Sequence, residues 1–128
     1  MRMHHVILSL AANRYQKSNL AKARQCLGEV FSDLYYTTEQ WTEPMSSTRH
    51  DLYLNQLAEG VTELELDTLN LRLKQIETDF GRTAEKRRLG IVPIDLDILE
   101  YDGQRYHERD WQRPYVTCLI GELRNGKI

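Results

Sequence analysis

Two acidic residues with strand spacing are the first candidates for chemistry in this sequence. Residues 94–99 read Ile-Asp-Leu-Asp-Ile-Leu, and this period of two predicts a strand with one buried, apolar face. Asp95 and Asp97 then project from the same opposite face, where the two anions repel each other unless water or a cation separates them. Mg²⁺ suits such a pair, because it favours one or two carboxylates together with substrate phosphate oxygens. The spacing alone leaves open the alternative of an acidic strand face in contact with water.

A run of basic residues stands just before this strand. Residues 82–89 are rich in charge, and a glycine and a proline follow them, so we expect an exposed loop. Arg82, Lys86, Arg87 and Arg88 could reach a polyphosphate held by a metal at the acidic pair. A metal and cations together suggest phosphoryl transfer, although a solvated charged loop would have the same composition. The sequence has no GxxxxGK[ST] motif, which argues against a P-loop nucleotide site.

A second group of candidates could bind a flat ring. Tyr53 and Asn55 are two residues apart in a predicted strand and so share a face. There, a tyrosine ring could stack on a heterocycle while an amide recognises its edge. An ordinary aromatic residue in the core or at its rim is the alternative. The histidines show no metal-ligand spacing, and we expect them at the surface: His4, His5, His50 and His107.

The elements that must position these residues follow from periodicity and turn signals. Strands are predicted over residues 5–10, 34–41, 53–58 and 94–99, and helices over residues 18–27 and 62–80. Gly28 and Gly81 follow the two helices, residues 45–51 form a polar loop, and Asp102-Gly103 predicts a hairpin turn that leads to Arg105 and Tyr106. The order β-α-β-β-α-β is that of an α+β, ferredoxin-like sandwich with an antiparallel sheet and both helices on one face. The hairpin is a C-terminal addition to this fold.

Composition limits the class of protein. A chain of 128 residues with 41% hydrophobic and 28% charged residues is expected to form a single domain, residues 1–128. The net charge of -2 argues against a nucleic-acid partner, and no apolar run is long enough for a signal peptide or a membrane span. Cys26 and Cys118 lack a CxxC spacing and are expected to be reduced, in or near the core. We expect a cytoplasmic protein with no membrane partner, and the oligomeric state is left open.

Several segments together resemble the 6-hydroxymethyl-7,8-dihydropterin pyrophosphokinase family of folate biosynthesis. Its signature G-R-(x5)-R-(x)-G-(x4)-D-L-D-I is matched without a break over residues 81–98. Further matches are Thr42-Glu43-Pro44, Tyr53-Leu54-Asn55, Ile76-Glu77, Asn13, and the run Arg113-Pro114-Tyr115-Val116, which resembles R-x-F-V. The resemblance spans roughly Val6 to Leu123 and is most specific in the middle of the chain.

This resemblance implies an activity and a role for each matched residue. The enzyme would transfer pyrophosphate from ATP to the pterin alcohol, with both small molecules as substrates. The resemblance implies that Asp95 and Asp97 hold two Mg²⁺ ions and that Arg82 and Arg88 contact the phosphates. Its remaining implications are Glu77 beside the nucleotide, Ile98 in the adenine slot, Thr42, Tyr53 and Asn55 around the pterin, and Tyr115 on the pterin's other face.

The chain also differs from the family pattern at residues that bear on catalysis. Ala11-Ala12 replaces a Gly-Ser pair, Leu89 replaces a tryptophan, and Val92 replaces an arginine that contacts phosphate. Reduced activity is therefore expected, and the alternative is a catalytically silent paralogue that binds a nucleotide, a pterin or a protein partner. A ferredoxin-like nucleic-acid binder is a third hypothesis, disfavoured by the net charge and by the lack of an RNP-like aromatic motif.

Overall fold

The computed structural model describes residues 2–44 and 51–125, in which six strands and five helices are found. The strands are β1 (His4–Ala12), β2 (Ser32–Tyr36), β3 (Gln40–Thr42), β4 (Tyr53–Thr62), β5 (Asp95–Tyr101) and β6 (Gln104–Arg105). The helices are α1 (Gln16–Leu27), α2 (Leu66–Asp79), α3 (Ala84–Arg88), α4 (Glu108–Trp111) and α5 (Pro114–Asn125). None of the helices in these ranges is long and apolar enough to cross a membrane.

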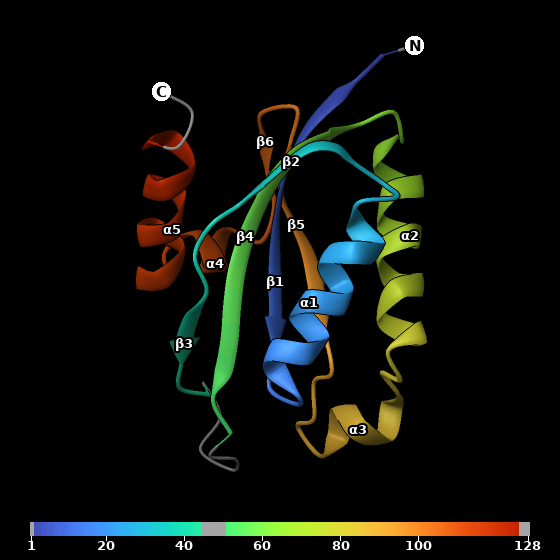
Figure 1. Cartoon of the computed structure of the whole chain (residues 1–128), viewed down its shortest axis with the longest axis vertical. Coiled ribbons are helices and arrows are strands. Elements are labelled where there is room, and N and C mark those ends of the chain that lie inside the picture. Colours follow the sequence, from blue (N-terminus) through green and yellow to red (C-terminus); the bar gives the residue numbers. More distant parts are fainter. Residues whose placement is uncertain (1, 45–50, 126–128) are drawn as a thin grey trace.

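The strands form one antiparallel sheet in the order β2-β4-β1-β5-β6, and β3 pairs with the start of β4. β1 lies between β4 and β5 and is antiparallel to both. This is the strand order of the predicted ferredoxin-like sandwich, with the predicted hairpin added at the β5 edge (Figure 1). The hairpin turn lies where the sequence placed it, because Asp102 and Gly103 both adopt a positive φ (48° and 86°).

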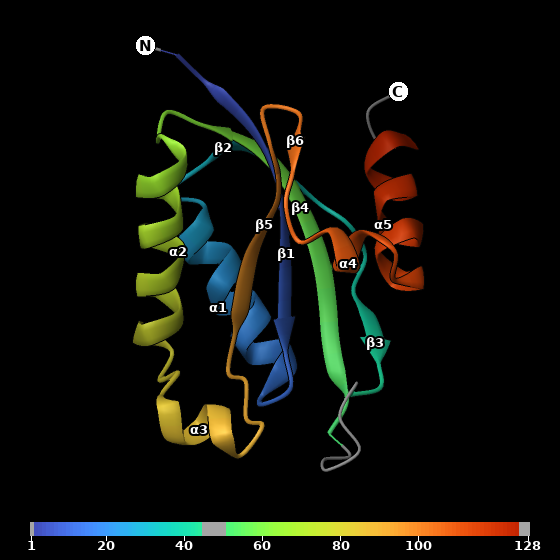
Figure 2. The same cartoon turned by 180° about the vertical axis from the view of Figure 1, so that it is seen from behind.

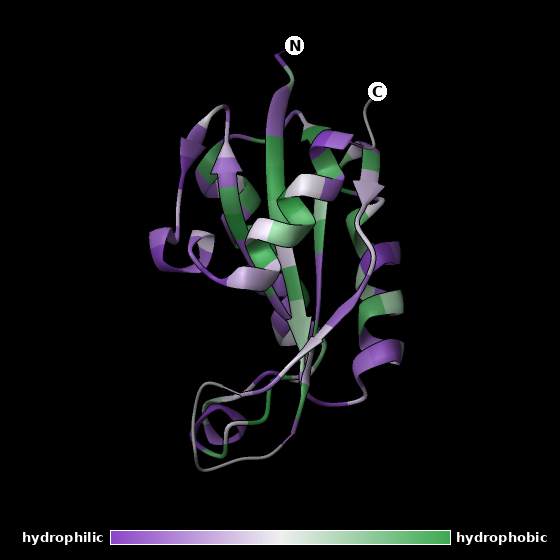
Figure 3. Ribbon diagram, turned by 90° about the vertical axis from the view of Figure 1, so that its left-hand side faces the viewer, coloured by the Kyte–Doolittle hydropathy of each residue, from purple (hydrophilic) through white to green (hydrophobic). Residues whose placement is uncertain are grey.

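Helices cover both faces of the sheet. α1 and α2 pack on one face, as predicted, through buried residues such as Leu20, Leu27, Leu69 and Leu73. α5 packs on the opposite face through Val116, Leu119, Ile120 and Leu123, which the sequence reasoning did not assign to a helix. Figures 1 and 2 show these three layers from opposite sides, and in Figure 3 the green hydrophobic residues gather where strands and helices meet.

The predicted strand over residues 34–41 is two strands in the structure, β2 and β3. Thr37, which lies between them, is 4% exposed and is bonded to Leu57 through both backbone and side chain. Its N–H donates to the Leu57 carbonyl, and its hydroxyl oxygen accepts from the Leu57 N–H, each at 3.0 Å. A hydroxyl therefore replaces one carbonyl of the ladder, and the chain bends away into β3.

The third predicted strand and the second predicted helix meet at a different place from the one expected. β4 continues through Gly60 to Thr62, so Thr62 belongs to the strand and α2 begins at Leu66. Gly60 does not end the strand, because it allows close packing: a Cβ there would lie 2.8 Å from the Leu34 side chain.

The basic segment is not the loop that was expected, because residues 84–88 form the short helix α3. Thr83 caps this helix, and its side-chain oxygen accepts from the Lys86 N–H at 3.1 Å. Gly90 follows with a φ of 72° and ends the turn. The local capping pattern therefore outweighs the repulsion within the run of positive charges.

Two expectations about single residue types are also corrected. Cys26 is half-buried, in line with the expectation, but Cys118 is exposed on the outer side of α5. His4 is buried, stacks on Tyr101 with ring centroids 4.9 Å apart, and its Nδ1 lies 2.6 Å from an Asp102 oxygen. The expected loop 45–51 and His50 lie almost wholly outside the described residues.

Candidate active site

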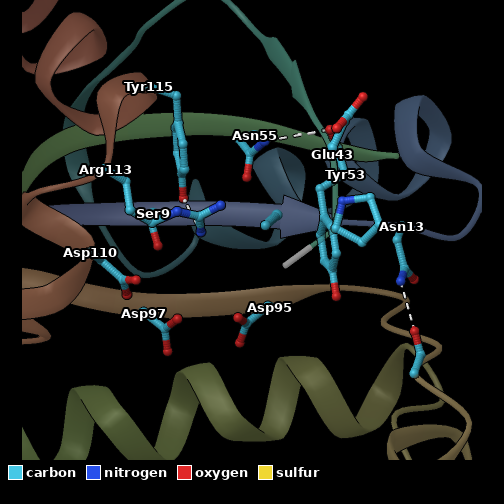
Figure 4. A pocket seen from close by; sticks show the side chains of 13 residues that line it. Ser9, Asn13, Glu43, Tyr53, Asn55, Asp95, Asp97, Asp110, Arg113 and Tyr115 are labelled. Carbon is cyan, nitrogen blue, oxygen red and sulfur yellow. Dashed lines mark hydrogen bonds between the residues drawn. The ribbon is translucent and has the colours of Figure 1, made fainter. Parts of the chain in front are cut away.

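A pocket of about 310 Å³ opens at the end of the sheet where β1 stops and β5 begins (Figure 4). Strands β1, β4 and β5 line it, together with the segments that follow β1, β3 and α3 and with residues 110–115, which run from α4 into α5. We call this the central pocket. Its lining residues are Ser9, Ala11, Asn13, Glu43, Pro44, Tyr53, Asn55, Gly90, Asp95, Asp97, Asp110, Arg113 and Tyr115.

The register of the sheet explains why a pocket forms there. Ala11 of β1 pairs with Asn55 on one side and with Asp95 on the other, so the three side chains form a row across one face. The next row contains Ser9 and Asp97. The central strand contributes only a hydroxymethyl and a methyl group to this floor, which leaves room between the outer strands for a ligand.

The acidic pair, Asp95 and Asp97, lies on the β5 wall of the pocket, as the strand period predicted. Burial, followed by the charge of Asp95, raises the pKa of Asp97 from 3.8 to about 6. The Nε2 atom of His107 and the Nζ atom of Lys74 lie 3.8 Å and 4.0 Å from an Asp97 oxygen and oppose this shift. Burial and the neighbouring Asp95 charge thus both disfavour the ionised form of Asp97.

This arrangement is suited to a divalent cation. Burial and the Asp95 charge raise the Asp97 pKa, and the positive charge of a Mg²⁺ ion at the acidic pair would offset both effects. Carboxylate oxygens are among the ligands that Mg²⁺ prefers. Within residues 2–44 and 51–125 no group of three or more His, Cys, Asp or Glu side chains is placed to hold a metal. The remaining ligands of such an ion would therefore come from water and from a bound phosphate.

Behind the acidic pair, Glu77 of α2 connects the helix to the edge of the sheet. It is 3% exposed, and its Oε2 accepts from the Leu96 N–H at 2.8 Å. Arg82 lies between two carboxylates, because its Nη1 is 3.1 Å from Glu77 Oε1 and 2.9 Å from Asp95 Oδ1. Burial raises the pKa of Glu77, while the Leu96 N–H and the charges of Lys74 and Arg82 lower it. The sequence placed Glu77 and Arg82 at the site but could not reveal this contact.

The other wall of the central pocket is aromatic. Figure 4 shows the rings of Tyr53 and Tyr115 on opposite sides of the pocket, with Asn55 between them. The Nδ2 atom of Asn55 donates to Thr42 Oγ1 at 2.8 Å and to the Gln40 carbonyl at 3.0 Å. Thr42 thus lies directly behind Asn55 and fixes its amide, rather than lining the pocket itself.

Four residues in or beside the pocket were not identified as candidates from the sequence: Lys74, His107, Asp110 and Arg113. Arg113 lies against the predicted pterin residue Tyr115 at the start of α5, with its guanidinium 4.6 Å from the ring centre and 3.4 Å from the hydroxyl of Tyr115. Burial raises the pKa of this hydroxyl. Asp110 and Arg113 line the pocket, and His107 and Lys74 reach Asp97 from outside. Among these residues, the sequence could have indicated only Arg113, because it stands two positions before the candidate aromatic residue Tyr115.

Five predicted site residues do not line the central pocket, and three of them, Thr42, Glu77 and Arg82, lie behind its walls in the contacts described above. The other two are Arg88 and Ile98. Arg88 is in the last turn of α3 and is exposed. Ile98 is 6% exposed and packs in the core between the sheet, α1 and α2. The role of Ile98 came from the resemblance alone, whereas the role of Arg88 was also suggested by the basic run before the acidic strand.

Asn13 joins the end of β1 to the segment that enters β5. Its Nδ2 donates to the Gly90 carbonyl at 2.7 Å, and its Oδ1 accepts from the Val92 N–H at 2.6 Å. The Asn13 backbone N–H also donates to the Val92 carbonyl at 2.9 Å. Three hydrogen bonds thus fix residues 90–92 at the rim of the pocket.

The fold and the pocket together define the class of protein first: a ferredoxin-like α+β protein with a small-molecule site that pairs aromatic rings with two carboxylates. Residues 7–125 match the family model for 7,8-dihydro-6-hydroxymethylpterin-pyrophosphokinase, and the chain belongs to this family. Enzymes of this family use ATP and Mg²⁺.

Two plant proteins are similar over 90 residues. A folate synthesis bifunctional protein from Arabidopsis thaliana is 38% identical over 64% of this chain and 19% of its own length. A mitochondrial folate synthesis bifunctional protein from Pisum sativum is 38% identical over 64% of this chain and 17% of its own length. The matched region is therefore less than a fifth of either relative.

Proposed function

We propose that this chain transfers pyrophosphate from ATP to 6-hydroxymethyl-7,8-dihydropterin, as a single pyrophosphokinase domain. The observation that carries the proposal is the central pocket, in which two tyrosine rings and an amide face the acidic pair. A flat, hydrogen-bonding ring fits the first group and a metal-bound polyphosphate fits the second. The family membership of residues 7–125 supports the same assignment.

The pterin ring is proposed to lie between Tyr53 and Tyr115, with its edge toward Asn55. The amide of Asn55 is already fixed by Thr42 and β3, so little conformational entropy is lost when it binds a ligand. In this orientation the hydroxymethyl group would point along the floor formed by Ser9 and Ala11, toward the acidic pair.

The triphosphate is proposed to lie at the acidic pair. Asp95 and Asp97 would hold two Mg²⁺ ions, which supply charge neutralisation on the phosphates and on the incoming oxygen. Arg82 is fixed by Glu77 and Asp95 and presents a guanidinium beside the same oxygens. Arg88 is proposed to reach the outer phosphates from α3, and Ile98 to support the wall beside the adenine.

The reaction is an in-line displacement at the β-phosphorus of ATP. The hydroxymethyl oxygen forms a bond to this phosphorus, and the bond from the phosphorus to the oxygen bridging the α- and β-phosphates breaks. AMP leaves with that bridging oxygen, and the hydroxyl proton passes to water. The two tyrosines and Asn55 hold the nucleophile in place, while Arg82 and the acidic pair hold the phosphates; this fixed geometry lowers the barrier.

A catalytically silent paralogue is the second candidate, and position 92 is the observation that favours it. Val92 offers no cation at the rim of the pocket. The same pocket would then bind a nucleotide or a pterin without turnover.

Release of AMP from MgATP, measured with and without 6-hydroxymethyl-7,8-dihydropterin, tests the proposal. We expect pterin-dependent AMP formation that stops when Mg²⁺ is chelated. Binding of both ligands without AMP formation would support the silent paralogue, and the absence of binding by either would contradict both.

A further inference from the structure

The edge of β5 next to the acidic pair is not covered by another strand in the described part of the chain. β6 pairs only with Glu100 and Tyr101, so the first half of β5 has no strand on its outer side. α2 runs beside this edge instead (Figure 2). The carboxylate of Glu77 accepts the Leu96 N–H there and takes the place of a ladder carbonyl. The side chains that surround Glu77 therefore lie next to the acidic pair.

Glu77 holds one cation on each of its oxygens, and each cation extends to one member of the acidic pair. Arg82 joins Glu77 Oε1 to Asp95, at 3.1 Å and 2.9 Å. Lys74 joins Glu77 Oε2 to Asp97, at 3.5 Å and 4.0 Å. Arg82 comes from the segment after α2, whereas Lys74 stands one turn before Glu77 on the helix itself. Each of the two cations therefore connects the buried Glu77 carboxylate to one aspartate of the acidic pair.

The contacts of Lys74 are too long and too exposed to contribute much to folding stability. Its side chain is 50% exposed, and both of its carboxylate contacts are longer than a hydrogen bond of about 2.9 Å. Exposed ion pairs of this kind contribute little to folding, because water screens them and the long side chain loses entropy. The ammonium group thus stays at the acidic pair while keeping donors for another anion.

We propose that Lys74 is a phosphate-binding residue, whose ammonium group donates to a non-bridging oxygen of the ATP polyphosphate beside Asp97. The inference rests on the proposed function, which places that polyphosphate at the acidic pair. Three carboxylates and two cations meet there, so the free site repels phosphate. Once a divalent cation neutralises the aspartates, the Lys74 ammonium, 4.0 Å from Asp97, would be free to donate to a phosphate oxygen held by that cation. A lysine acts as a point charge in such a site and needs no bidentate geometry.

Calorimetric titration of MgATP and of AMP tests this role in four proteins: the parent, Lys74→Gln, Lys74→Arg and Arg72→Gln. Arg72 is the matched control, because it is exposed on the same helix and lines a different hollow. Loss of one charge-assisted hydrogen bond is expected to weaken MgATP binding about tenfold in Lys74→Gln. Binding of AMP should change less than twofold, Lys74→Arg should stay within about threefold of the parent, and Arg72→Gln should not change.

An equal loss for ATP and AMP would place Lys74 at a part that both nucleotides share, the base, the ribose or the α-phosphate, and would overturn the proposal that it binds the β- or γ-phosphate. An unchanged MgATP affinity in Lys74→Gln would overturn it as well. Failure of the proposed function has a separate signature. If the parent binds MgATP but forms no AMP with the pterin, the transfer reaction is wrong while the Lys74 result still stands. If the parent binds no MgATP at all, both proposals fail together.

Discussion

Asp97 has opposite effects on ligand binding and on folding. It lies in the central pocket with its side chain 19% exposed, and burial and Asp95 raise its pKa to about 6. Above that pH the folded state must carry a charge that the unfolded chain carries more easily. The residue therefore costs stability in the range where it would bind a metal, as expected for a group kept for function rather than for folding.

Replacing this carboxylate should separate the two effects. In Asp97→Asn we expect the free energy of unfolding to rise by roughly 1–3 kcal/mol above pH 6, because the destabilising charge is gone. The gain should shrink as the pH falls and disappear below about pH 4, where the aspartate is protonated in both states. Thermal or urea unfolding at several pH values measures this, and calorimetry of the same protein should show no Mg²⁺-dependent binding of ATP.

Asp102→Asn is a control of opposite sign. The His4 ring and the His5 N–H hold the pKa of Asp102 below its ordinary value. The stability contributed by this carboxylate is present at neutral pH and is lost in acid, so its removal should destabilise the protein. Destabilisation of both variants at neutral pH would contradict the raised pKa of Asp97.

Tyr53 is expected to act on the pterin alone. Tyr53→Ala should weaken binding of the pterin by about 1–3 kcal/mol, the range found when stacking on a heterocycle is removed, and leave MgATP affinity nearly unchanged. Tyr35→Ala removes a partly exposed tyrosine of β2 that does not line the pocket and should affect neither ligand. Equal losses for both ligands in Tyr53→Ala would mean that Tyr53 supports the fold instead.

At the scale of elements, local patterns predicted the order of the sheet but not the segments that depend on distant partners. The alternation in residues 94–99 and the turn at Asp102-Gly103 are local, and both were predicted correctly. The break after β2 depends on Thr37 bonding to Leu57, twenty residues away along the chain. α5 has apolar residues at helical spacing, a signal that was present but was not used.

The candidate site likewise contains some residues that a local pattern predicts and others that only the packing of distant elements brings there. Asp95 and Asp97, and Tyr53 and Asn55, are neighbours on one strand, so their shared face follows from the strand period alone. Lys74, His107 and Asp110 come to the site from α2 and from the segment after β6, and only the packing of those elements on the sheet reveals them.

Residues 90–92, which lead into β5, allow a test of whether the lack of an arginine at position 92 slows the reaction. Asn13 fixes Gly90 and Val92, so a side chain at position 92 has a defined origin at the rim of the pocket. Val92→Arg should raise the rate of AMP release severalfold or more with little change in MgATP affinity, since the added donor would act mostly in the transition state. Leu71→Arg adds the same charge at an exposed position of α2 outside the pocket and should leave the rate unchanged. A similar gain in both variants would indicate a general charge effect rather than a contact.

At the scale of the whole molecule, the two hydrophobic cores share the same strands. Neighbouring residues point to opposite faces, so that Leu8 belongs to the core under α1 and α2 while Ile7 belongs to the core under α5. Each strand that lines the central pocket therefore depends on both cores for its position. We infer that the chain unfolds as one unit, with neither core stable alone.

Two matched substitutions test this inference. Leu73 on α2 is 0% exposed and Leu119 on α5 is 1% exposed, and each belongs to a different core. Truncation to alanine should cost about 2–5 kcal/mol in either case. If the cores are coupled, Leu73→Ala and Leu119→Ala should each keep a single transition with a lowered midpoint.

Trp111 reports on the core under α5, because it packs against that core and donates to the carbonyls of Leu99 and Tyr106 at 3.1 Å and 3.0 Å. In a Trp41→Phe background its fluorescence can be followed beside circular dichroism during urea unfolding. Leu73→Ala, made in the other core, should shift the Trp111 transition and the dichroism transition to the same lower urea concentration. Leu71→Ala, at a position 71% exposed on the same helix, should shift neither. A Trp111 transition that stays at the parent midpoint in Leu73→Ala would show that the two faces of the sheet unfold separately.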